Sequence, residues 1–384
     1  MVRPPVAERF RSLSSSATIE MSERVRAARA AGHPILPLSS GDPNLSTDQR
    51  IIDAAGEALR GGNIRYSSSG GERGLRSAIA RRELLRSGVV YDPDDIIVTA
   101  GGKFALLTAL MGVISPGDEV LIPAPSWVSY GPCTRLAGGI PIPLAMLDTF
   151  DVEVARAALT PATRAIIVNS PVNPTGRVLS RSDIEGVVAL ADEYNLWIIF
   201  DQVYADLVHS SHPITYPQGL AAGAERTLVV DSFSKSFGMT GWRLGSLAMP
   251  SGLAKFVTKF VQHSIYCVPT FIQAAGERAL ELGDELLPGY RAHFRARLER
   301  AIDALVDVDG LSCTMPDAGF FLFPSVTEDD VVVARRWVDE LNIAVLPGSA
   351  FGAAGAGHLR ISLSCRDEEL DIALARIVTS GVAR

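Results

Sequence analysis

Lys235 lies in a short polar segment that follows an apolar run ending at Val230. A lysine amine can condense with a carbonyl group and then holds that compound covalently. Ser232 and Ser234 precede the lysine and Arg243 follows it by eight residues, and hydroxyl and guanidinium groups of this kind bind phosphate dianions. A single lysine beside serines is usually a solvated loop residue, so the prediction of a covalent lysine beside a phosphate site depends on the groups around it.

Asp201 closes the apolar run that begins at Trp197. An unpaired carboxylate is costly to bury there, whereas one that faces a cationic ring nitrogen is stabilised and raises the pKa of that nitrogen. Tyr204, three residues later, is placed to offer its hydroxyl to the same ligand. The alternatives are an N-cap or a solvated turn for Asp201 and a core aromatic for Tyr204.

Two glycine-containing turns supply further candidates. Gly101, Gly102 and Lys103 follow a strand-like run and precede a helix-like one, where free backbone N–H groups and the helix dipole hold phosphate. Asn173 lies in a turn that two prolines and Gly176 make rigid, and we expect its amide to donate to a ligand oxygen. Each turn taken alone is equally typical of a tight connection.

Trp127 and Arg360 complete the set of candidates. Trp127, in the segment from Pro125 to Tyr130, can cover one face of a planar ring. Arg360 is a cation on a late strand-like segment, and its guanidinium can hold a carboxylate through two hydrogen bonds. The alternatives are a core tryptophan and a surface ion pair.

These groups match the requirements of one cofactor, pyridoxal 5'-phosphate (PLP). PLP needs a lysine for covalent attachment, a carboxylate that keeps its pyridine nitrogen protonated, donors for its phenolate oxygen and a phosphate cradle. The ring withdraws electrons from the substrate α-carbon only while its nitrogen stays positive, so the carboxylate takes part in the chemistry. We therefore predict a PLP enzyme in which Lys235, Asp201 and Tyr204 are the catalytic residues.

The elements that must position these residues predict an α/β fold. Short apolar runs rich in β-branched residues alternate with helix-like stretches, which indicates βαβ units and a largely parallel, buried sheet. The carboxyl ends of parallel strands share one edge, where ligands bind, so we expect the polar residues at these ends to meet there. The predicted strands cover residues 96–99, 119–122, 140–144, 165–169, 197–201, 227–231 and 244–249.

The pattern changes after about residue 282 and predicts a smaller α+β domain. A long helix at 290–306, a helix near 329–341 and strand-like segments at 319–324 and 358–363 make up this part. We expect residues 1–48 to form an N-terminal arm and part of the small domain. Residues 49–281 would form a large domain with a mostly parallel seven-stranded sheet between helices, and residues 282–384 the small C-terminal domain.

Composition argues against several classes of protein. The chain has 384 residues, 47% of them hydrophobic, and a net charge of −7 without a long basic tract, which argues against a nucleic-acid partner. Its four cysteines lie far apart with no CxxC pair, so we expect neither disulfides nor a metal site. No apolar run reaches the about 18 residues that span a bilayer. Glutamates in the Ser- and Arg-rich N-terminal segment are not typical of a transit peptide, and we expect a cytoplasmic protein.

The candidate residues also occur in the order and spacing of a known family. The chain resembles the class I/II aminotransferases, which are PLP enzymes of fold type I, and among them the branch of the bacterial aspartate aminotransferases. The resemblance covers nearly the whole chain. It is carried by Ser16-Ala-Thr18, Gly41-Asp-Pro-Asn-Leu45, Tyr66, Gly74-Leu-Arg76, Val98-Thr-Ala-Gly-Gly-Lys103, Pro125-Ser-Trp-Val-Ser-Tyr130, Asn173-Pro-Thr-Gly176, Asp201-Gln-Val-Tyr204, Ser232-Phe-Ser-Lys235, Gly241-Trp-Arg243, Pro347-Gly-Ser-Ala-Phe351 and Leu359-Arg-Ile-Ser362.

The resemblance implies a cofactor contact for most of these residues. Lys235 would carry PLP as a Schiff base and shuttle the proton, and Asp201 would pair with the pyridine nitrogen. Tyr204 and Asn173 would hold the phenolate oxygen, and Trp127 would stack on the ring. The phosphate would be bound by the turn around Gly102 and by the polar segment before the lysine; these residues are Gly101, Gly102, Lys103, Ser232, Ser234 and Arg243.

The resemblance also implies how the substrate and a second subunit take part. Arg360, Asn173, Trp127 and the backbone of Gly41 would contact the substrate, with Arg360 on its carboxylate. Tyr66 would reach the phosphate bound by the neighbouring subunit, which implies a homodimer. The implied reaction is reversible transamination between an L-amino acid and a 2-oxo acid.

Other functions remain open at this point. The same residues would serve a different PLP reaction, such as β-elimination, cyclisation or oxidation of an amino acid. A regulatory protein that binds PLP without turnover would need a DNA-binding domain, for which the N-terminal arm is too short and too mixed in charge. A nicotinamide-dependent enzyme would need a GxGxxG turn in the first strand–helix unit, and none is present.

Two positions depart from the pattern of the family. Gln202 replaces the usual glutamate after Asp201, and we expect little effect on the cofactor. The loop at residues 263–269 is bulkier than usual and carries Tyr266. The sequence identifies no second cation for a distal substrate carboxylate, and so does not favour aspartate as the substrate.

Overall fold

A seven-stranded sheet forms the centre of the molecule in the computed structural model, which describes residues 6–11, 13, 16–147 and 149–380. The order of its strands is β2-β8-β7-β6-β5-β3-β4. All neighbouring pairs are parallel except those of β8, which is antiparallel to β2 and β7. The strands are β2 (Ile96–Thr99), β3 (Glu119–Ala124), β4 (Ile140–Ala145), β5 (Thr163–Asn169), β6 (Trp197–Asp201), β7 (Thr227–Ser232) and β8 (Gly245–Ala248).

The expected α/β fold with a mostly parallel sheet is therefore confirmed, and every predicted strand overlaps an observed one. The central strands are apolar along their length because both faces are covered. In β6, Ile198 and Phe200 pack into one helical layer while Ile199 packs into the other. A strand buried on both faces loses the alternation of polar and apolar residues, so only its length and its polar last residue identify it.

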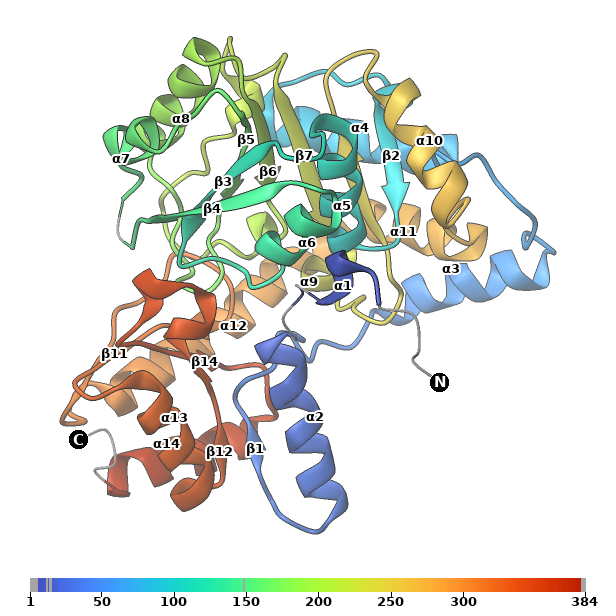
Figure 1. Cartoon of the computed structure of the whole chain (residues 1–384). Helices are drawn as coiled ribbons and strands as arrows, with labels where there is room; N and C mark the ends of the chain where they lie inside the picture. Colours follow the sequence, from blue (N-terminus) through green and yellow to red (C-terminus); the bar gives the residue numbers. More distant parts are fainter. Residues whose placement is uncertain (1–5, 12, 14–15, 148, 381–384) are drawn as a thin grey trace, which may run out of the picture.

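Helices cover both faces of the sheet (Figure 1). One layer contains α5 (Gly102–Val113), α6 (Tyr130–Leu136) and α10 (Ala254–Ser264). The opposite layer contains α3 (Gln49–Arg60), α4 (Arg73–Ser87), α7 (Val152–Ala157), α8 (Arg181–Glu193) and α11 (Thr270–Glu281). The start of α8 shows how local residues fix where a helix begins. The Ser180 side chain accepts from the backbone N–H of Asp183, and the Asp183 side chain accepts from the backbone N–H of Ser180.

The chain after the sheet forms a smaller α+β part, which the N-terminal segment joins. Strand β1 (Leu36–Pro37) pairs in parallel with β12 (Ile343–Ala344), and α2 (Ala17–Ala30) packs beside them (Figure 1). The other elements are α1 (Glu8–Arg11), α9 (Phe233–Ser236), α12 (Gly283–Leu305), β9 (Leu311–Ser312), β10 (Phe321–Leu322), β11 (Ser325–Val326), α13 (Asp330–Leu341), β13 (Leu346–Pro347), β14 (Leu359–Ser362) and α14 (Asp367–Ser380). Of these, α9 directly follows β7 of the central sheet.

The division into residues 1–48, 49–281 and 282–384 stays a prediction, and its outer ends lie outside the described residues. Within the described part of the chain, every helix is too short or too polar to cross a membrane.

Candidate active site

A cavity of about 170 Å³ lies at the carboxyl edge of the central sheet. Asn169, Asp201 and Ser232, which are the last residues of β5, β6 and β7, meet there. Lys235 and Asp201 share this cavity, as a cofactor bound between them requires. The lining residues are Thr18, Gly41, Gly102, Lys103, Trp127, Tyr130, Asn169, Asn173, Asp201, Val203, Tyr204, Ser232, Ser234, Lys235, Arg243 and Arg360.

Asp201 is buried at the end of β6 and is held by hydrogen bonds on both carboxylate oxygens. The hydroxyl of Tyr130 donates to Oδ2 at 2.8 Å, and the backbone N–H of Val203 donates to Oδ1 at 3.1 Å. Burial raises the pKa of Asp201 to about 6, the two hydrogen bonds oppose that rise, and the charge of Asp231 adds to it. A cation placed against this carboxylate would favour its ionised form.

Lys235 lies in the single turn of α9, directly after β7. Its Nζ atom donates to the backbone oxygen of Gly41 at 2.5 Å, which ties the lysine to the N-terminal segment. Burial lowers the pKa of Lys235 to about 8; the charge of Asp42 opposes this shift, while the nearby cations Arg360 and Arg243 add to it. An amine with this pKa is partly neutral near pH 8, as a nucleophile or a base must be.

The turn between β2 and α5 forms a cradle beside Arg243. Gly101 has φ of 87°, and a Cβ atom there would lie 2.5 Å from Nη2 of Arg243, so the turn requires glycine. Arg243 itself has φ of 54°, and its Nη1 donates to the backbone oxygen of Thr240 at 2.8 Å. Gly102 begins α5, which directs free backbone N–H groups at the cavity, and the Ser232 hydroxyl lies 3.0 Å from that of Ser234. This set of donors suits a phosphate dianion.

Arg360 is buried in β14 at the opposite side of the cavity, where its guanidinium lies over two aromatic rings. Its Cζ atom is 4.4 Å from the ring centroid of Phe321 and 4.9 Å from that of Phe351. Nη1 donates to Oδ1 of Asn173 at 3.2 Å and Nη2 to the backbone oxygen of Ser39 at 2.8 Å, while Nε has no hydrogen-bond partner among the described residues. Burial lowers the pKa of Arg360 to about 10. A buried cation with an unused donor fits an anionic ligand group.

Two of the predicted site residues do not line the cavity. Gly101 lies just behind it, where it makes room for Arg243. Tyr66 is 84% exposed and packs on Tyr266, with ring centroids 4.8 Å apart. Tyr66 is therefore not among the residues that line this cavity, and its expected contact with a neighbouring subunit stays a prediction.

Several lining residues were missed as site residues in the sequence. Tyr130, Asn169, Thr18 and Val203 all line the cavity. Tyr130 and Thr18 lie in the segments that carry the family resemblance, and Asn169 ends a predicted strand, so signals for these three existed. A buried tyrosine is nevertheless most often a core residue, and only its hydrogen bond to Asp201 shows otherwise.

Lys103 also changes the account drawn from the sequence. Lys103 lines the cavity, and its ammonium lies 5.3 Å from the ring centroid of Trp127, although the residue as a whole is exposed. The residues that line the cavity thus include a cation besides Arg360, Arg243 and Lys235, although the sequence analysis identified none for a distal carboxylate. The sequence gives no local signal for this, because most lysines in the first turn of a helix only contact solvent.

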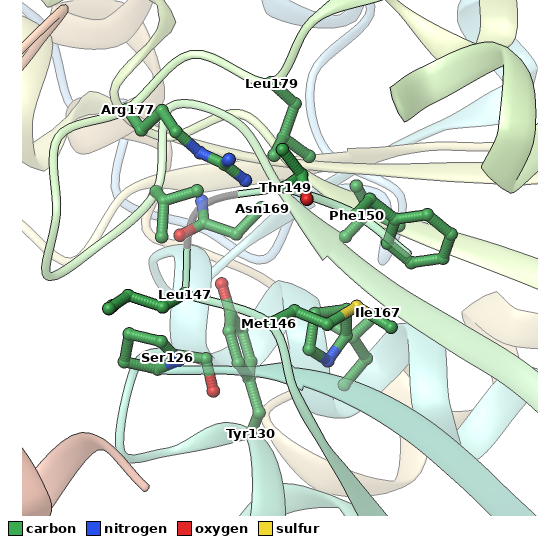
Figure 2. A pocket seen from close by; sticks show the side chains of 14 residues that line it. Ser126, Tyr130, Met146, Leu147, Thr149, Phe150, Ile167, Asn169, Arg177 and Leu179 are labelled. Atoms are coloured by element: carbon green, nitrogen blue, oxygen red, sulfur yellow. The ribbon is translucent and has the colours of Figure 1, made fainter. Parts of the chain in front are cut away.

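A second, smaller cavity of about 30 Å³ adjoins the floor of the site (Figure 2). Tyr130 and Asn169 line both cavities, so they form the wall between them. Met146, Leu147 and Ile167 line the smaller cavity together with Tyr130 (Figure 2). This largely apolar backing keeps the hydrogen bond of Tyr130 to Asp201 in a medium of low dielectric, where it is strong.

Gln202, for which we expected little effect on the cofactor, is not among the residues that line the cavity. It is fully buried, and its Nε2 atom donates to Oε1 of Glu83 at 2.6 Å. A glutamate at this position would instead face a second carboxylate.

Comparison with known proteins agrees with this geometry. The sequence profile of the aminotransferase class I and II family matches residues 33–377. The chain belongs to this family. It is 33% identical to an aspartate aminotransferase of Geobacillus stearothermophilus over 97% of this chain and 98% of that one. It is also 35% identical to an arginine–pyruvate transaminase of Pseudomonas aeruginosa over 94% of each chain.

Solved structures of this family share the fold. The aspartate aminotransferase from Thermus thermophilus with maleate has a TM-score of 0.93 with 31% identity, covering 98% of this chain and all of that one. The chain is thus a PLP-dependent aminotransferase of fold type I, and the expected function and cofactor are confirmed. The cavity fits PLP: a carboxylate lies at one side, an amine at another, and the glycine cradle beside Arg243 would not accept a Cβ atom.

Proposed function

We propose that Lys235, Asp201 and Tyr204 are the catalytic residues of amino-group transfer in this cavity, and that Arg360 binds the substrate carboxylate. The single observation that carries the assignment is the shared cavity of Lys235 and Asp201, with the Arg243 cradle and the Arg360 guanidinium in its walls. Gly101, Gly102, Lys103, Ser232, Ser234 and Arg243 would hold the phosphate, and Asn173, Tyr204 and Trp127 the ring.

Each residue then has a defined chemical task. Bound PLP supplies an electron sink for the bond that breaks at the substrate α-carbon. Asp201 would hold a negative charge beside the ring nitrogen, and because its hydrogen bonds already fix the carboxylate, it would not have to move during the reaction. The Nζ atom of Lys235 accepts a proton and returns it, since burial brings its pKa close to neutral pH. Arg360 orients the substrate through its carboxylate.

Rapid mixing of the holoenzyme with single amino acids tests the proposal. We expect each good substrate to convert the lysine-bound cofactor into its amine form within one turnover, with one equivalent of 2-oxo acid released. Ammonia formed with the lysine-bound form unchanged would favour elimination instead. A protein that carries no cofactor after incubation with PLP would overturn the assignment.

The substrate class is inferred from Lys103, a cation that lines the cavity besides Arg360. We propose that the Lys103 ammonium recognises a distal carboxylate, so that dicarboxylic amino acids are preferred. It is supported by the position of Lys103 over Trp127 in the cavity wall, by several relatives named aspartate aminotransferase and by the similar structure with the dicarboxylate maleate. Lys103→Met should lower kcat/KM for aspartate and glutamate by about tenfold or more and leave that for alanine within about twofold. Equal losses on all substrates would contradict this role.

We also propose a homodimer in which Tyr66 reaches the partner's cavity. This is supported by the exposed Tyr66, whose ring packs on that of the exposed Tyr266, and by the exposed Ile64 and Ile265 close to these two tyrosines in the sequence. Sedimentation should give twice the chain mass, and Tyr66→Ala should weaken cofactor retention.

We propose a cytoplasmic location as well, since all four cysteines are unpaired, which is typical of a reducing compartment.

A further inference from the structure

A buried ionic network lies beside the cavity without lining it. Helix α4 supplies its two cations, Arg82 and Arg86, and the carboxylate of Glu83. Asp206 and Asp231 supply two more carboxylates. None of these five side chains is more than 16% exposed. Charges removed from water to this degree are costly, so their arrangement requires close pairing.

Arg86 connects two segments beside the site through separate guanidinium nitrogens. Its Nη1 atom donates to Oδ2 of Asp231 at 2.6 Å and also lies 3.2 Å from Oε1 of Glu83. Its Nη2 atom donates to Oδ1 of Asp206 at 2.7 Å. Asp231 belongs to the end of β7, and Asp206 to the short helix η2 (Ala205–Leu207) after β6. One planar group therefore spans two segments that are not adjacent in sequence.

The other members of the network extend these connections. Oδ2 of Asp206 accepts from Arg82 and, at 2.5 Å, from the hydroxyl of Ser236. Oε1 of Glu83 accepts from Nε2 of Gln202 at 2.6 Å. Through these contacts α4 is linked to two separate segments of the chain, residues 202–206 and 231–236.

Each segment that the network holds carries a proposed site residue. Gln202 follows Asp201 directly, and Asp206 is two residues after Tyr204. Asp231 precedes Ser232, and its Oδ1 atom accepts from the Ser232 backbone N–H at 2.7 Å. Ser236 follows Lys235 directly.

We propose that Arg82 and Arg86 are positioning residues, which hold the segments of Asp201, Tyr204, Ser232 and Lys235 in one fixed arrangement. This inference rests on the proposed roles of those four residues. The physical reason is that reacting groups displaced by about 1 Å lose on the order of a hundredfold in rate. Lysine cannot replace Arg86, because a single ammonium does not present two nitrogens in a plane to Asp206 and Asp231.

The experiment compares Arg86→Met, Arg86→Lys and Ser236→Ala with the wild-type holoenzyme. The readouts are the melting temperature, the rate at which the diluted holoenzyme loses its bound-cofactor absorbance, and kcat and KM separately. We expect Arg86→Met to release cofactor about tenfold faster and to lower kcat by about ten- to a hundredfold, with KM within about threefold because Arg360 lies outside the network. Ser236→Ala, a smaller change that keeps every charge, should lower kcat by severalfold.

Arg86→Lys separates positioning from charge. It should recover most of the melting temperature lost in Arg86→Met while kcat stays low. Arg226→Met and Thr258→Ala are the matched controls. Arg226 is a mostly buried arginine that pairs with Asp192 of α8 and directly precedes β7, at the end of that strand away from the site. The Thr258 hydroxyl donates to the backbone oxygen of Ala254 in α10. Both controls should leave kcat and cofactor release unchanged.

The outcomes are distinguishable. Wild-type kcat and cofactor release in Arg86→Lys and Ser236→Ala would overturn the inference, as would an equal loss in Arg226→Met. If Arg86→Met does not fold, these two milder variants still decide the question. A wild-type protein that binds no PLP would instead overturn the proposed function, on which the inference depends.

Discussion

The hydroxyl of Tyr130 donates a 2.8 Å hydrogen bond to the carboxylate of Asp201 in the buried floor of the cavity. The two residues come from α6 and β6 and are 71 positions apart. Burial disfavours the charge on Asp201, and this hydrogen bond is the largest influence that opposes the effect. Tyr130 therefore acts on the ionisation of Asp201 rather than on the substrate.

Replacing Tyr130 by Phe should raise the pKa of Asp201 further. Hydrogen bonds to charged groups contribute about 1.5–3 kcal/mol, which corresponds to roughly one to two pH units. Because a protonated Asp201 cannot pair with a cationic ring, the acidic limit of cofactor retention should move to higher pH by that amount. Measuring cofactor release between pH 5 and 8 checks this. Tyr91→Phe is the control, since the buried Tyr91 hydroxyl has no hydrogen-bond partner among the described residues; an identical shift there would contradict the role of Tyr130.

Removing the amine of Lys235 should abolish covalent cofactor attachment and slow turnover. Lys235→Ala is expected to lose the visible absorbance of the lysine-bound cofactor and to reduce kcat by at least about a hundredfold, the usual contribution of a positioned acid–base group. Absorption spectra and steady-state assays measure both effects. Lys259→Ala, on the exposed side of α10, should behave as wild type. Full turnover by Lys235→Ala would refute its assignment.

The pH at which the cofactor-free protein captures PLP should follow the ionisation of Lys235. Burial lowers the pKa of Lys235 to about 8, below its ordinary value of 10.5, and only the neutral amine reacts with a carbonyl group. The capture rate should therefore rise as the pH increases through about 8. Asp42 raises the pKa of Lys235, so Asp42→Asn should shift the midpoint to lower pH. A stopped-flow series across pH 6–10 measures the midpoint, and a shift to higher pH would disprove the influence of Asp42.

Arg360 should affect substrate binding more than cofactor retention. Arg360→Met removes the guanidinium that lies over Phe321 and Phe351, and kcat/KM should fall by about ten- to a hundredfold, mainly through KM. Arg360→Lys should recover little, because an ammonium lacks the planar pair of donors. Arg181→Met, at an exposed ion pair with Glu185, serves as the control. Unchanged KM in both Arg360 variants would require another carboxylate-binding group.

The amide of Gln202 should stabilise the fold through its hydrogen bond to the carboxylate of Glu83. Gln202→Glu would set two carboxylates against each other at Glu83, and we expect the free energy of unfolding to fall by about 1–3 kcal/mol near neutral pH. The double variant Glu83→Gln, Gln202→Glu exchanges the amide and the carboxylate and should recover most of the loss if the two residues interact directly. Denaturant unfolding of the four proteins gives the coupling, and additive losses would show that the contact is unimportant.

The sequence predicted the strands of the sheet and most of the site because both depend on local patterns. A short apolar run with a polar last residue identified β6 and its Asp201, and the same signal located the ends of β5 and β7. Since parallel strands end at one edge, these polar residues were expected together without any knowledge of long-range contacts. Only strand lengths differed, by one or two residues at six of the fourteen ends, because strand ends depend on neighbouring strands.

The tertiary structure alone decided which side chains act on one another across the fold. The hydrogen bond of Tyr130 to Asp201, the approach of the Lys103 ammonium to Trp127 and the link from Arg86 to Asp206 and Asp231 join segments far apart in the chain. No local pattern marks such a pair, because a buried tyrosine or a helix arginine has the same sequence surroundings whether it packs in the core or holds a catalytic group. Spacing and residue type determine which groups are available, and the distances set by packing determine their ionisation and their partners.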